Sequence, residues 1–123
     1  MAEWNKYELI EFFGVLPEED EDQTYLSFHV EKDGLRLYVS FFHYASDVYI
    51  DIFRNGVDKP VFRTKIENSA GMKYMKHANG WECLEVAVPH RNVSFEEEWI
   101  IPMGARIIVN PHISVEIFQP SAG

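Results

Sequence analysis

The sequence predicts a mainly β fold: an antiparallel β-sandwich or flattened barrel of about seven to eight strands, with one short N-terminal helix. Three observations indicate this class. Short apolar runs are separated by turn residues throughout the chain, one helix-capping pattern stands near its start, and strands do not alternate with helices as in a parallel sheet. The 123 residues suit one globular domain, residues 1–123, whose core needs no disulfide or metal.

Residues 5–13 are the expected helix. Asn5 can cap it, Glu8 stands at the capping-box position, Gly14 can end it and Pro17 prevents it from resuming. Its apolar residues are spread over more than one side. We therefore expect the helix to be covered by the rest of the fold, against an edge or a face of a sheet.

Five consecutive acids, Glu18–Asp22, follow the helix. Blocks of like charge are usually solvated, so we expect a mobile loop. The alternating carboxylates and the glycine of an EF-hand loop are absent, but calcium binding and contact with a basic partner both stay open.

A three-strand meander is expected over Thr24–Lys32, Leu35–His43 and Val48–Arg54. Asp33-Gly34 favours a tight type I′ turn. That turn places Lys32 opposite Leu35 and, at the far end of the hairpin, Tyr25 opposite Phe42. A turn at Tyr44–Asp47 would pair the second and third strands so that the facing residues are His43 and Val48, Phe42 and Tyr49, Phe41 and Ile50, Ser40 and Asp51, Val39 and Ile52, and Tyr38 and Phe53.

Alternation sorts the meander into an aliphatic face and a mixed aromatic and polar face. The aliphatic face is core: Leu26, Phe28, Val30, Leu37, Val39, Phe41, Val48, Ile50 and Ile52. The mixed face carries Tyr25, Ser27, His29, Glu31, Arg36, Tyr38, Ser40, Phe42, Tyr49, Asp51 and Phe53. This face is either open or covered by the helix or the C-terminal strands. Covering is the favoured alternative, because so many exposed aromatic residues are unusual on a monomer.

The second half of the chain predicts further short strands. They are Val61–Glu67, a hairpin of Met72–His77 and Trp81–Val88 about Ala78-Asn79-Gly80, and then Ala105–Val109 and His112–Phe118 around Asn110-Pro111. Pro89 ends one strand, and a second acidic run stands at Glu96–Glu98.

No catalytic or metal-binding pattern stands out. There is no GxSxG elbow, and the glycines form no phosphate-cradling loop. Cys83 lies in an apolar strand, where a cysteine is usually a packing residue. The five histidines lack ligand spacing. We expect no metal, no cofactor and no enzymatic activity.

The net charge of −9 argues against nucleic acid and anionic membranes as partners, because both reward clustered lysine and arginine. A basic protein fits better. The single cysteine is typical of a reducing, cytoplasmic compartment, and the N-terminus shows no secretion signal.

Size, charge and the missing catalytic motif suggest a non-catalytic protein-interaction module, an inhibitor or immunity-type protein that neutralises a basic protein. We expect its partner-binding residues to be Asp20, Glu21, Tyr38, Tyr49, Asp51 and Phe53. The alternative is a β-sandwich that binds a carbohydrate or another small molecule on its aromatic face. Self-association into a homo-oligomer stays open as well.

Overall fold

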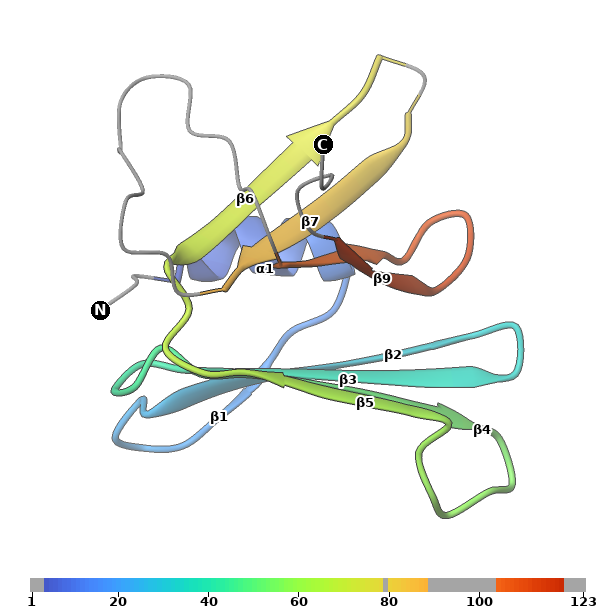
Figure 1. Ribbon diagram of the computed structural model, residues 1–123, viewed down its shortest axis with the longest axis horizontal. Helices are drawn as coiled ribbons and strands as arrows, with labels where there is room; N and C mark the ends of the chain where they lie inside the picture. The colour runs from blue at the N-terminus through green and yellow to red at the C-terminus, as the bar shows by residue number, and fades with distance from the viewer. Residues whose placement is uncertain (1–3, 79, 89–103, 119–123) are drawn as a thin grey trace, which may run out of the picture.

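The computed structural model describes residues 4–78, 80–88 and 104–118, which form two antiparallel sheets and one helix (Figure 1). The order along the chain is α1 (Lys6–Phe13), β1 (Glu18–Glu19), β2 (Tyr25–Lys32), β3 (Leu35–Phe42), β4 (Val48–Arg54), β5 (Phe62–Ile66), β6 (Gly71–Lys76), β7 (Glu82–Ala87), β8 (Gly104–Ile108) and β9 (Ser114–Phe118). The first five strands form one sheet in sequence order, and the last four form the other. The mainly β class with an N-terminal helix is confirmed.

The helix is capped as its sequence predicts. Asn5 Oδ1 accepts a hydrogen bond from the Glu8 N–H at 3.1 Å, and Gly14 adopts the left-handed conformation with φ 73°, donating to the Ile10 carbonyl at 2.8 Å. The ring of Phe12 packs edge-on to Tyr74 of β6, whereas Phe13 stacks on Phe28 of β2. The helix therefore bridges the two sheets on the aliphatic side of the meander.

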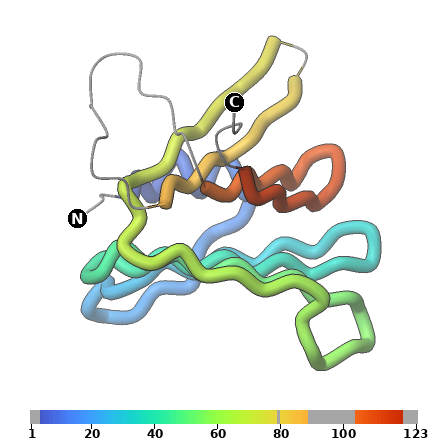
Figure 2. Tube along the Cα trace, in the orientation of Figure 1, coloured from blue at the N-terminus to red at the C-terminus, as the bar shows by residue number. Residues whose placement is uncertain are grey.

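The core is one cluster between the sheets, and Figure 2 shows the chain leaving the five-stranded sheet after β5 and continuing into the four-stranded sheet. The five-stranded sheet contributes the predicted aliphatic residues, among them Phe28, Leu37, Val39, Phe41, Val48 and Ile50, all fully buried. The four-stranded sheet contributes Leu84, Val86, Ala105 and Ile107, which are also fully buried. At about 1.5–3 kcal/mol for each large apolar side chain, this burial is the main force that holds the layers together.

The register of β2 with β3 is as predicted, from Tyr25 opposite Phe42 to Lys32 opposite Leu35. The predicted register of β3 with β4 is wrong by two residues, because Phe41, not His43, lies opposite Val48. His43 remains bound to the preceding strand, its N–H donating to the Thr24 carbonyl at 3.0 Å. The connection is thus longer than a four-residue turn. A shift of two residues keeps each side chain on its predicted face but changes its neighbours.

The acidic segment is partly a strand and not simply a loop. Glu18 and Glu19 pair with Ser27 and Leu26, so β1 forms an edge of the five-stranded sheet. The Glu19 carboxylate also forms an ion pair with the Lys6 ammonium at 2.7 Å. The remaining strands lie within two residues of their expected bounds. Pro89 and Glu96–Glu98 lie outside the described residues.

Candidate functional site

The mixed face of the meander is turned away from the four-stranded sheet, and among the described residues no helix or strand lies across it (Figure 1). The expectation that α1 or the C-terminal strands cover it is therefore wrong. We call this surface the outer face. Its side chains are Tyr25, Ser27, His29 and Glu31 of β2; Arg36, Tyr38, Ser40 and Phe42 of β3; Tyr49, Asp51 and Phe53 of β4; and Arg63 and Lys65 of β5.

One aromatic cluster lies toward the turn between β1 and β2. The ring of Phe42 contacts Tyr25 at 5.8 Å on one side and Tyr49 at 5.3 Å on the other, measured between centroids. The Lys65 ammonium lies 4.9 Å from the centre of the Tyr49 ring, a cation–π contact. Tyr49 remains 37% exposed. The ring faces at this position already accept a cation.

A second aromatic cluster lies toward the β2–β3 hairpin turn. The imidazole of His29 stacks on Tyr38 with centroids 4.3 Å apart, and Tyr38 packs edge-on to Phe53 at 5.6 Å. The Arg36 guanidinium lies 5.1 Å from the Phe53 centroid. Each ring partly covers its neighbour, which explains how the face carries many aromatic residues while most stay half-buried.

The polar groups between the clusters are largely paired with one another. The hydroxyls of Ser27 and Ser40 lie 2.9 Å apart, and Arg63 donates to Asp51 at 2.9 Å. These pairs cross between adjacent strands, as expected for side chains that face each other on a sheet. They leave little uncompensated charge in the middle of the face.

Four of the six residues predicted to bind a partner, Tyr38, Tyr49, Asp51 and Phe53, share the outer face. The other two, Asp20 and Glu21, lie in the adjoining β1–β2 turn. Asp20 accepts hydrogen bonds from the Thr24 N–H and hydroxyl at 2.6 and 2.5 Å, and the hydroxyl bond lowers the pKa of its carboxyl group. Asp20 therefore shapes the turn, while Glu21 is exposed.

An open depression of about 470 Å³ adjoins the hairpin end of the outer face. It is lined by Glu31 and Arg36 and by the β4–β5 connection from Asn55 to Asp58. Arg36 donates to the Val57 carbonyl at 3.2 Å and so links β3 to this connection. The sequence carries no local signal that this connection meets Arg36.

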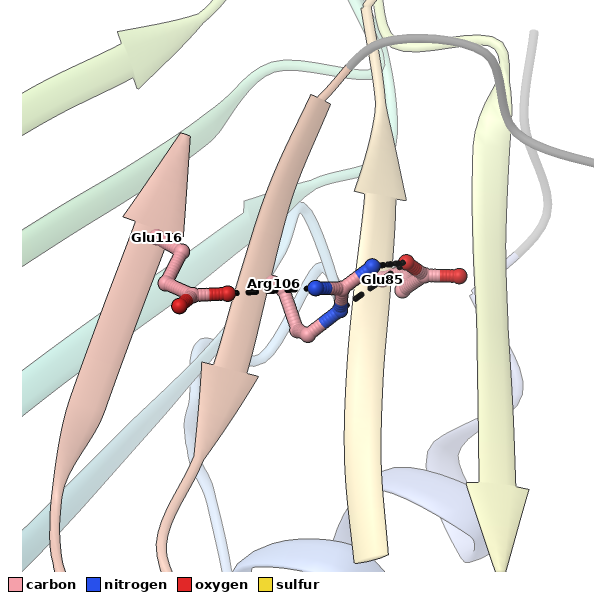
Figure 3. A network of polar contacts seen from close by, with 3 residues as sticks. All are labelled: Glu85, Arg106 and Glu116. Carbon is pink, nitrogen blue, oxygen red and sulfur yellow. Dashed lines mark hydrogen bonds and ion pairs between the residues drawn. The ribbon is translucent and has the colours of Figure 1, made fainter. Parts of the chain in front are cut away.

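The outer side of the four-stranded sheet carries a polar network that the sequence did not reveal (Figure 3). Arg106 of β8 donates to Glu85 of β7 at 2.8 Å and to Glu116 of β9 at 3.1 Å. Glu85 is only 7% exposed, so Arg106 provides an ion-pair partner to a nearly buried side chain. Hydrogen bonding to Glu85 raises the pKa of Arg106 further.

In the part of the chain that the structure describes, no group of three histidine, cysteine or acidic residues is placed to hold a metal ion. Cys83 is fully buried, and burial raises the pKa of its thiol, which disfavours the reactive thiolate. No described helix is long and apolar enough to span a membrane.

No protein-family model and no curated protein matches the chain. Its fold is similar to that of a chain in a solved structure described as a "Contact-dependent growth inhibition toxin - immunity protein complex from Klebsiella pneumoniae 342". The TM-score is 0.73 over 95% of this chain and 94% of the other, with 13% sequence identity. The likeness covers nearly the whole of both chains, and at this identity it shows the fold alone.

Proposed function

We propose that this protein is an immunity-type inhibitor, which binds a basic protein toxin through the outer face and neutralises it without catalysis in the cytoplasm. The observation that carries the proposal is the similarity of the whole fold to a chain of a toxin and immunity protein complex. A net charge of −9 suits the inhibitory side of such a pair, since opposite charge speeds the encounter with a basic toxin.

The outer face supplies the second requirement of an inhibitor, which is contact area held in a fixed shape. Its aromatic residues are positioned by neighbouring rings and by paired sheet strands, so binding would cost little side-chain entropy. Tyrosine and arginine are frequent among the residues that dominate interface energies. Such a face buries apolar rings while the surrounding carboxylates steer the approach.

The test has two stages. A tagged chain captures its partner from native lysate at low and high salt, and the captured protein is then expressed alone or together with this chain while growth is followed. We expect a basic partner that dissociates in high salt, arrests growth alone and is harmless when this chain is present. Growth arrest by this chain itself, or failure to rescue, would overturn the proposal.

A small-molecule module remains the second candidate, because the His29–Tyr38–Phe53 cluster stands near the open depression and rings of this kind stack on sugars. It predicts that Tyr38→Ala abolishes binding on an oligosaccharide array without lowering the unfolding midpoint. Equal loss of stability and binding would count against this candidate.

A further inference from the structure

The charges around the outer face are distributed unequally between its two ends. One end of the sheet holds the β1–β2 turn and the β3–β4 connection, which Figure 1 shows side by side. The residue after β5, Glu67, lies at this end too. The His43 N–H joins the two connections by its bond to the Thr24 carbonyl. We call this the acidic end. The Lys6–Glu19 ion pair at this end is neutral. The other acidic residues there are Glu18, Asp20, Glu21, Asp22, Asp47 and Glu67, and the other basic residue is Lys65.

Six carboxylates and one ammonium leave the acidic end with a formal charge of −5. The opposite end, at the β2–β3 turn and the β4–β5 connection, carries Glu31, Asp33 and Asp58 against Lys32, Arg36, Arg54 and Lys59, a formal charge of +1. Between them, Asp51 and Arg63 neutralise each other at 2.9 Å. A basic partner is therefore attracted to one end of the sheet and not to the other.

Aromatic contact area is present at the same end. The Tyr25–Phe42–Tyr49 cluster lies on the outer face there, and Tyr44 in the β3–β4 connection is 78% exposed. The Lys65 ammonium over Tyr49 shows that a cation fits against one ring of this cluster. Arginine and lysine side chains bind both carboxylates and aromatic faces, and this end offers the two together.

We infer that the acidic end of the outer face, and not its hairpin end, is the anchor for the basic partner, which presents lysine or arginine side chains to Glu21, Asp22 and the Tyr25–Phe42–Tyr49 cluster. This inference rests on the proposed function for the nature of the partner. It also shifts the anchor away from Phe53 and Tyr38, which lie toward the less acidic end.

A first experiment needs no identified partner. The ¹⁵N-labelled chain is titrated with hexa-arginine amide, and the amide chemical shifts are followed at low and high salt. We expect changes concentrated at residues 20–25 and 42–49 that disappear in high salt. Changes concentrated at residues 31–36 and 54–59, or spread evenly over the chain, would overturn the inference.

The second experiment compares two double variants that change the net charge equally. Glu21→Lys with Asp22→Lys alters the acidic end, and Glu31→Lys with Asp58→Lys alters the hairpin end; all four positions are exposed. Against the partner found in the growth test, we expect the first pair to slow association about tenfold or more at low salt and the second to change it less than about twofold. An equal effect of both pairs, or a larger effect of the second, would refute the assigned anchor while leaving the inhibitory function intact.

Aromatic contributions are separated from charge in the same assay. Tyr44→Ser with Tyr49→Ser is compared with Tyr38→Ser with Phe53→Ser, and thermal unfolding shows whether each variant still folds. We expect the first pair to speed dissociation about tenfold and the second to have a smaller effect. The reverse order would place the anchor at the hairpin end and overturn the inference.

Discussion

At the scale of single residues, Gly104 is the position where the fold tolerates no side chain. A Cβ atom built on Gly104 would lie 1.9 Å from the Val86 carbonyl oxygen and 2.9 Å from its carbon. Because the obstacle is backbone in the adjacent strand, it cannot turn aside. The close approach explains a glycine at the beginning of β8.

Gly104→Ala is therefore expected to lower the free energy of unfolding by about 2–3 kcal/mol, measured by urea denaturation. Gly34→Ala is the control. Gly34 has a positive φ of 81° but open space around it, so the strain of its backbone alone should cost about 1 kcal/mol. Equal losses in the two variants would contradict the steric explanation.

The Asp20–Thr24 contact predicts a pH dependence of stability. The pKa of Asp20 is lowered from its usual 3.8, chiefly by the Thr24 hydroxyl, so the folded state holds the carboxylate in its ionised form. The stabilisation is present above the unfolded pKa and is lost as the pH falls through the lower, folded value.

Thr24→Val removes the hydroxyl and keeps the volume. We expect its urea midpoint to lie below that of the unaltered chain at about pH 6, and the difference to shrink as the pH falls well below the usual pKa of 3.8. Asp20→Asn has no ionisable group at this position, so we expect it to lack the part of the pH dependence of stability that Asp20 contributes. A difference that persists unchanged in acid would show that the charge has no part in it.

At the scale of elements, Arg106 connects three strands of the four-stranded sheet. It contacts Glu85 on one side and Glu116 on the other, and Glu85 is nearly enclosed (Figure 3). Loss of the arginine breaks the ion pair of a nearly buried carboxylate, which costs more than the pair itself contributes.

Arg106→Met is accordingly expected to destabilise the chain by about 2–3 kcal/mol in urea denaturation, a figure reduced because Arg106 is about one-third exposed. Arg63→Met is the matched control: it removes a surface partner from Asp51 and should cost less than about 1 kcal/mol. Restoration of part of the loss by adding Glu85→Gln to Arg106→Met would confirm the cause; no restoration would contradict it.

The elements also show what the sequence could determine. The turn chemistry of Asp33-Gly34 specifies one hairpin geometry, so every facing pair of β2 and β3 was predictable. The β3–β4 connection depends on distant contacts: Asp47 Oδ1 accepts from the Asn68 N–H at 2.8 Å, and Ser69 donates to the Ser46 carbonyl at 2.8 Å. Local reasoning misses such contacts, and so it placed β4 two residues out of register.

The candidate site was predictable in part for the same reason. Alternation along a strand assigns Tyr38, Tyr49, Asp51 and Phe53 to one face whatever the register. Which face the helix covers depends on packing between the sheets: Phe12 and Phe13 are buried on the aliphatic side, against Tyr74 and Phe28. The difference in charge between the two ends of the outer face could not be predicted from the sequence, because it depends on which turns the sheet topology brings to the same end.

At the scale of the whole molecule, one apolar cluster joins both sheets and the helix, which favours unfolding as a single unit. Two buried groups can test this from opposite layers. The Trp4 indole N–H donates to the Phe42 carbonyl at 3.0 Å on the five-stranded sheet, and the Cys83 thiol is fully buried in β7 of the other.

We expect hydrogen exchange of the Trp4 indole and thiol labelling of Cys83 to report the same opening free energy, equal to that from urea denaturation followed by circular dichroism. The raised pKa of Cys83 also slows labelling, so the intrinsic rate is taken from the unfolded chain in urea. A lower opening free energy at Cys83 than at Trp4 would mean that the four-stranded sheet opens alone. The two sheets would then be separable units despite their shared core, and a partner bound at the acidic end would stabilise only the first.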